Sequence, residues 1–101
     1  MKAEIAERLT CLNIQVVSEG DYFCVFVRDT CLAMAPCDQG EFTGVGSTGI
    51  SSEQGLGYLV LRNGEYLLAG SKFEIPASAE DVQKVQRFSA DLKVALGLDL
   101  T

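Results

Sequence analysis

Hydrophobic positions near the start of the chain follow first a helical and then a strand period. Residues 2–12 carry apolar side chains at helical spacing, which predicts a short helix. Residues 13–18 and 21–28 predict two strands joined by a two-residue turn at Glu19-Gly20. The apolar face of the helix consists of Ile5, Leu9 and Leu12.

The predicted turn determines which side chains share a face of this hairpin. It pairs Val17 with Tyr22 and Val16 with Phe23, and side chains alternate across each strand. One face is then formed by Ile14, Val16, Phe23, Val25 and Val27. The opposite face is formed by Tyr22, Cys24 and Phe26.

The middle of the chain combines a third strand with a glycine-rich segment. Residues 30–35 predict a strand that ends at Pro36, because proline cannot donate a hydrogen bond to a sheet. Residues 38–57 contain six of the ten glycines, interleaved with serine and threonine, which predicts a flexible loop. Within it, residues 51–54 have the capping pattern of a single helical turn.

A hairpin around Asn63-Gly64 is the clearest local prediction. Asn-Gly accepts positive φ at both central positions of a type I′ turn, and residues 56–62 and 65–71 supply the two strands. This register places Arg62 opposite Glu65. One face carries Leu59, Leu61, Tyr66 and Leu68, and the other carries Tyr58, Val60, Leu67 and Ala69.

The last part of the chain predicts a longer helix. Ser78 is its N-cap, Asp81 completes a capping box and Gly97 ends it. Its apolar face is formed by Val82, Val85, Phe88, Leu92 and Leu96. The whole order predicts one α+β domain over residues 1–101, with an antiparallel sheet of about five strands flanked by an N-terminal and a C-terminal helix.

Both faces of both predicted hairpins are largely apolar. An antiparallel sheet with one face in water normally alternates apolar and polar side chains, and contiguous exposed apolar patches usually mark interaction sites. We therefore expect one face to pack under the helices and part of the other to be buried in a homodimer. The alternative is a monomer with its helices on opposite faces. The candidate interface consists of Tyr22, Cys24, Phe26, Tyr58, Val60 and Leu67.

Composition excludes several kinds of chemistry. The 101 residues include no histidine, which removes the Ser-His-Asp and Cys-His nucleophile pairs and the histidine-containing zinc sites. Four cysteines form no C-x-x-C pair, so we expect structural, reduced thiols. We expect no catalytic residues, cofactor or metal, and a non-enzymatic protein.

Net charge limits the partners. Fourteen acidic and eight basic residues give a charge of −6, which argues against nucleic acid and anionic membranes. No basic residue lies between Arg28 and Arg62, so a partner of that region is expected to be a neutral or cationic protein segment. The absence of a signal-peptide pattern and of a long apolar run leads us to expect a cytoplasmic protein.

Two local motifs do not indicate a functional site. Residues 44–49 match the dinucleotide pattern G-x-G-x-x-G, but the preceding residues are no hydrophobic strand and no long helix follows. Cys37 adjoins Asp38 and lacks a neighbouring cation that would activate a nucleophilic thiol.

The order of helix, three strands, short turn, two strands and helix, together with the acidity, resembles class I type III secretion chaperones. The resemblance covers most of the chain and concerns architecture and charge, without a shared motif. It implies a dimer that holds unfolded effector segments, with the family's middle helix reduced here to the turn at residues 51–54.

The second hypothesis is a small-molecule-binding domain or a minor enzyme. Its pocket would lie between sheet and helix, roofed by residues 38–57 and lined by Cys37, Glu41, Phe42 and Tyr66. A closed pocket with convergent polar groups would favour this hypothesis, whereas a flat apolar patch shared by two copies would favour the first.

Overall fold

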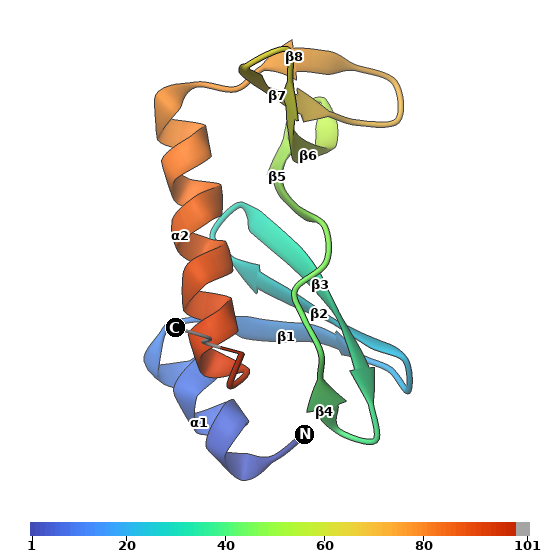
Figure 1. Cartoon of the computed structure of the whole chain (residues 1–101), viewed down its shortest axis with the longest axis vertical. Helices are drawn as coiled ribbons and strands as arrows, with labels where there is room; N and C mark the ends of the chain where they lie inside the picture. Colours follow the sequence, from blue (N-terminus) through green and yellow to red (C-terminus); the bar gives the residue numbers. More distant parts are fainter. Residues whose placement is uncertain (99–101) are drawn as a thin grey trace.

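The computed structural model describes residues 1–98. The chain begins with helix α1 (Ala3–Cys11) and its last helix is α2 (Ala79–Ala95) (Figure 1). Between them lie β1 (Gln15–Glu19), β2 (Phe23–Arg28), β3 (Cys31–Asp38), β4 (Glu41–Phe42), β5 (Thr48–Ser52), β6 (Gly55–Arg62), β7 (Glu65–Ala69) and β8 (Glu74–Pro76). The α+β class with an antiparallel sheet is confirmed, although the described residues form eight strands where about five were predicted.

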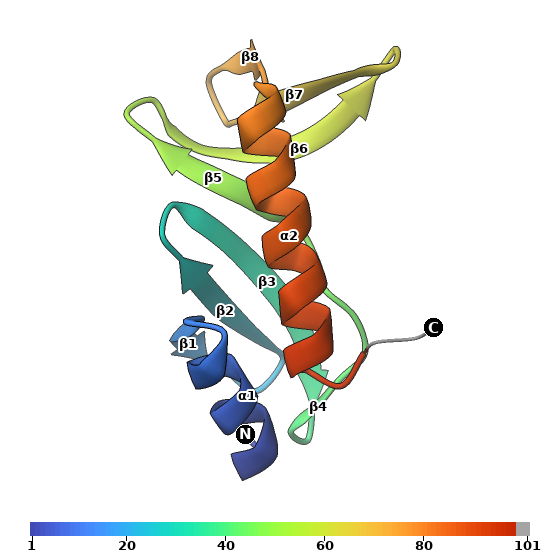
Figure 2. The ribbon, with the colours of Figure 1, turned by 90° about the vertical axis from the view of Figure 1, so that its left-hand side faces the viewer.

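The strand order is β1-β2-β3-β5-β6-β7-β8, and β4 pairs with the end of β3. Every neighbouring pair is antiparallel. The sheet twists strongly between β3 and β5, and α2 runs along both parts of it (Figures 1 and 2). Helix α2 therefore lies along the strands on both sides of this twist.

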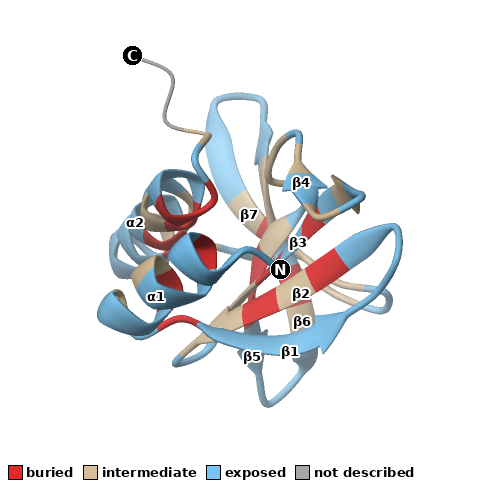
Figure 3. Cartoon of the chain, turned by 90° about the horizontal axis from the view of Figure 1, so that it is seen from below, coloured by how far each residue is buried: buried red, intermediate tan, exposed pale blue. Residues whose placement is uncertain are grey.

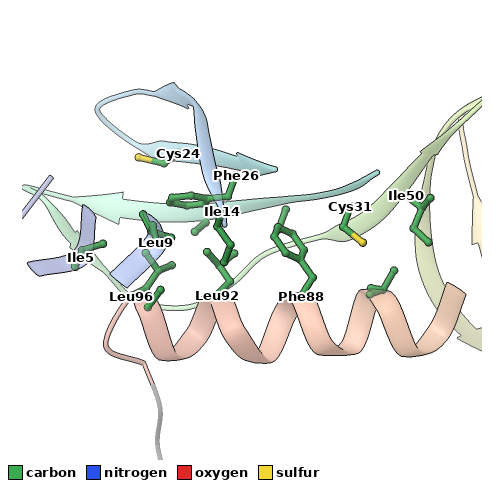
Figure 4. Close-up of a cluster of buried hydrophobic side chains, with 14 residues drawn as sticks. Ile5, Leu9, Ile14, Cys24, Phe26, Cys31, Ile50, Phe88, Leu92 and Leu96 are labelled. Carbon is green, nitrogen blue, oxygen red and sulfur yellow. The ribbon is translucent and has the colours of Figure 1, made fainter. Parts of the chain in front are cut away.

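Both helices pack on the same face of the sheet, as the view from below shows (Figure 3). The core between them contains Leu9 of α1, Phe88 and Leu92 of α2 and Phe26 of β2, which is completely buried (Figure 4). The alternative arrangement with helices on opposite faces is therefore wrong. The other face of the sheet has no helix over it in the described part of the chain.

The second helix and the second hairpin follow their local signals. Ser78 Oγ accepts a hydrogen bond from the backbone N–H of Asp81 at 3.1 Å, and Gly97 after the helix has φ +75°. In the hairpin, Arg62 pairs with Glu65 around Asn63 (φ +52°) and Gly64 (φ +79°), which confirms the type I′ turn.

The first hairpin has a different register from the predicted one. Its ladder ends at the pair Glu19–Cys24, beyond which Gly20 N–H donates to the carbonyl of Phe23 at 2.9 Å, so the turn is centred on residues 21–22 and not on Glu19-Gly20. The ladder is also irregular between Val16 and Ser18, and Val16 pairs with Phe26 rather than Phe23. The displaced turn and the bulge at Val17 are features that the sequence pattern does not report.

Strand β3 continues through Pro36, contrary to the prediction. Cys37 N–H donates to the carbonyl of Tyr22 on the β2 side, whereas Met34 N–H donates to the carbonyl of Ser47 on the other side. Successive residues of a strand point their N–H groups to alternate sides. The nitrogen of Pro36 therefore faces the side on which β3 pairs with β5, and that pairing ends at Ala33, before Pro36. The proline therefore interrupts no hydrogen bond of the ladder.

Part of the predicted loop at residues 38–57 is sheet. Thr48–Ser52 forms β5 between β3 and β6, so the predicted helical turn at residues 51–54 is wrong. A Cβ on Gly49 would lie 2.3 Å from the carbonyl oxygen of Gly57, which is closer than any side chain allows. Glycine at position 49 is what lets β5 approach β6 this closely.

Candidate interaction surface

The face of the sheet turned away from the helices is apolar, and we call it the open face. The strand registers place residues of β2, β3, β6 and β7 on it together. These are Phe23, Val25, Val27, Leu32, Met34, Tyr58, Val60 and Leu67. All eight are half-buried or exposed, and 45% of the surface of Phe23 remains accessible.

One row of residues shows that the open face is continuous across the twist. Val27 pairs with Leu32, Leu32 with Gly49, Gly49 with Tyr58 and Tyr58 with Ala69. Paired residues of neighbouring strands point to the same face, so this row carries apolar groups from β2 to β7. Gly49 contributes no side chain to this row.

Charged side chains lie at the border of this surface rather than at its centre. Arg62 and Glu74 form an ion pair beside the tip of the β6–β7 hairpin. Residues 23–27 of β2 and 31–37 of β3 contain no charged residue at all. An uncharged apolar centre with a charged border is the usual composition of a protein interface.

The predicted interface residues divide into two groups. Tyr58, Val60 and Leu67 lie on the open face, and Tyr22 is 82% exposed in the β1–β2 turn. Cys24 (2% exposed) and Phe26 are buried under the helices and belong to the core. Their assignment to an uncovered face is therefore wrong, because the helices cover the Cys24 side of β2.

The predictions missed Phe23, Val25 and Val27, which occupy the open face instead. The alternation within β2 correctly separated them from Cys24 and Phe26. Both sets of alternate side chains in β2 are apolar, so the pattern could not show which set faces water.

The predicted pocket residues do not converge. Cys37 and Phe42 line a cavity of about 360 Å³ together with Cys24 and the β1–β2 turn. Glu41 pairs with Lys2, with Oε1 and Nζ 3.6 Å apart. The hydroxyl of Tyr66 accepts a hydrogen bond from Gln86 Nε2 at 3.3 Å, at the opposite end of the molecule (Figure 1).

Two other cavities lie along α2, where the segment between β4 and β5 passes the helix. They measure about 470 and about 380 Å³ and share Ala90 and Lys93 in their walls. The first contains polar side chains from the helix and from β5, including Gln86, Ser89 and Thr48.

Acidic residues gather at the end of the molecule that holds the β1–β2 turn and β4. Glu19, Asp21 and Asp38 line the cavity beside Cys37. The N-terminal ammonium of Met1 lies 3.0 Å from Glu19 Oε1, whereas Asp21 and Asp38 form no ion pair within the described residues. This end of the chain is therefore negatively charged.

Within residues 1–98, no three cysteine or carboxylate side chains come close enough together to hold a metal ion. The helices of this part of the chain are too short or too polar to cross a membrane. Comparisons of the chain with protein-family models, with curated proteins and with solved structures found no match.

Proposed function

We propose that this chain is a non-enzymatic binding or adaptor protein that acts as a homodimer through its open face. The observation that carries the proposal is the pair of helices on one face of a sheet whose other face is apolar from β2 to β7. The proposed occupant of the open face is a second copy of this chain.

The size of the surface supports this occupant. A compact monomer of 10.9 kDa is expected to expose about 5,600 Å², whereas this chain exposes 6554 Å². Its radius of gyration is 13.7 Å, compared with about 12.7 Å for a compact domain of this length. The chain is therefore less compact than a typical monomer of its mass, and an interface of standard size would cover about 800 Å² of each copy.

Charge favours a self-association through this face over one through the acidic end. Two copies with a net charge of −6 repel each other, so their contact must exclude the carboxylates. The open face does so at its centre. In a two-fold dimer the same apolar patch is used by both copies, which leaves the acidic ends free for a neutral or cationic protein segment.

Light scattering coupled to gel filtration tests the proposal. We expect twice the 10.9 kDa chain mass at micromolar concentration, with little change on addition of salt, because the contact is apolar. A measured mass of 10.9 kDa, that of a single chain, over the whole concentration range would overturn the proposal.

We place the protein in the cytoplasm, consistent with its four unpaired thiols.

The cavities along α2 support the alternative function, binding of a small molecule. That alternative would be favoured by a ligand that protects residues lining both cavities, such as Ala90 and Lys93, from hydrogen exchange while the chain remains monomeric.

A further inference from the structure

Two thiols lie in contact where β2 and β3 reach the acidic end of the molecule. The Sγ atoms of Cys24 and Cys37 are 3.9 Å apart, and all four cysteines of the chain are free thiols. Cys24 pairs with Ala35, two residues before Cys37, so the two thiols are diagonal neighbours on the same face of the sheet. Their side chains therefore point toward one another across the ladder.

The two thiols differ in their access to solvent. Cys24 is 2% exposed, whereas Cys37 is half-buried, and both line the cavity of about 360 Å³ beside the β1–β2 turn. Burial and the adjacent Cys37 thiol raise the pKa of Cys24. An oxidant that enters the cavity therefore meets the thiol of Cys37 first, with Cys24 directly behind it.

We propose that Cys24 and Cys37 form an oxidisable pair that hydrogen peroxide converts to an intramolecular disulfide in the folded protein. The thiolate of Cys37 attacks one peroxide oxygen, the O–O bond breaks, and Cys37 becomes a sulfenic acid with release of water after proton uptake. The sulfur of Cys24 then displaces the hydroxyl group from Cys37, which leaves as a second water with the proton of Cys24. Two thiols and one peroxide give one disulfide and two waters.

Charge in the cavity favours a small neutral oxidant. Glu19, Asp21 and Asp38 line it and repel anionic disulfides such as oxidised glutathione, whereas they do not repel hydrogen peroxide.

The two sulfur atoms must move closer together to form the bond. A disulfide brings the sulfur atoms to about 2.05 Å, so the separation must fall from 3.9 Å. Cys37 is near the end of β3, where its Sγ also donates a weak hydrogen bond to the carbonyl of Gly20, 3.5 Å away. The bond would fasten the end of β3 to β2 and thereby fix the turn that carries Tyr22.

The test uses a variant in which Cys11→Ser and Cys31→Ala leave only the pair. It is treated with hydrogen peroxide in the folded state, quenched with catalase, unfolded and alkylated. We expect a mass lower by two hydrogens, no alkylation, and two alkylations after a dithiol reductant. Trypsin should release residues 9–28 covalently linked to residues 29–62, because cleavage follows Arg8, Arg28 and Arg62.

The matched control adds Cys24→Ser, which leaves Cys37 without a partner thiol. This variant should show no intramolecular bond and should accumulate oxygenated Cys37 or disulfide-linked dimers. The proposal is overturned if both thiols of the pair variant remain open to alkylation, or if the linked peptides form only when peroxide is added in denaturant. A second measurement, the urea midpoint, should rise on oxidation of the pair variant and not of the control.

Discussion

Arg28 at the end of β2 and Asp91 in α2 form a partly buried ion pair, with Nη1 and Oδ2 2.8 Å apart. The same guanidinium donates to the carbonyl of Leu12 at 3.2 Å and lies 5.5 Å from the ring centre of Phe88. This one side chain therefore connects the sheet, the end of α1 and the middle of α2.

Asp91→Ala should lower the free energy of unfolding by about 1–2 kcal/mol, since it leaves a partly buried charge with only a carbonyl and a ring as partners. Urea unfolding at neutral pH measures the change. Lys84→Ala is the matched control, because Lys84 forms an exposed ion pair with Glu80 on the same helix. It should cost less than about 0.5 kcal/mol. Equal losses in the two variants would contradict the role given to Arg28.

Gly49→Ala should destabilise the fold by about 2–3 kcal/mol, because a Cβ there would overlap the backbone of Gly57 and force β5 and β6 apart. Gly44→Ala provides the comparison, since nothing lies within 4 Å of its Cβ position and its φ is not positive. That substitution should be neutral or stabilise by up to about 1 kcal/mol. The prediction fails if thermal unfolding shows the same shift for both.

Val60→Asp should dissociate the proposed dimer, because it places a carboxylate at the apolar centre of the open face. We expect the dissociation constant to rise by roughly a hundredfold or more. Leu61→Asp is the control on the same strand, as Leu61 is 61% exposed and points to the opposite face. Circular dichroism should be native-like for both variants. A dimer that tolerates Val60→Asp as well as Leu61→Asp does not use this face.

The stability contributed by Cys31 should decline in alkaline solution. Burial is the main cause that raises the pKa of this thiol above its ordinary value of 9.0. Above pH 9 the unfolded chain loses this proton before the folded chain does, so stability falls as the pH rises through that interval. The slope is at most about 1.4 kcal/mol per pH unit.

Comparison of the wild type with Cys31→Ala isolates this contribution. The difference in unfolding free energy between them should narrow as the pH rises above the ordinary thiol pKa of 9.0. A difference that is constant with pH would contradict the expected effect.

Turn and helix-capping motifs in the sequence predicted those elements of the fold that depend on neighbouring residues. The type I′ turn requires positive φ, which Asn63 and Gly64 adopt, and Ser78 with Asp81 caps the helix. The hairpin and the helix were therefore predicted at the correct positions. In contrast, the identity of the covered face depends on packing between distant elements. The sequence shows Phe26 and Val25 on opposite faces but contains no polar marker that selects Phe26 for the core.

Residues 48–52 escaped prediction for a different reason. Thr48 and Ile50 favour strands, but Gly49 and the two serines do not, and the segment is a strand because it is held on both sides by β3 and β6. The diagonal contact of Cys24 with Cys37 was missed because it requires the correct register of β2 and β3 beyond Pro36.

The position of α2 after the described strands has a consequence for synthesis on the ribosome. Its residues Phe88 and Leu92 cover Phe26, and Arg8 Nε donates to the carbonyl of Ala95 at 2.9 Å, so the last helix closes over the first elements made. A nascent chain ending at Pro76 would already contain the eight described strands, yet only the short helix α1 would lie on one apolar face and the open face would be uncovered. Such an intermediate should bind a hydrophobic dye and lack cooperative unfolding, and a well-folded fragment of residues 1–76 would contradict this. Until α2 emerges, the growing polypeptide therefore depends on protection from aggregation.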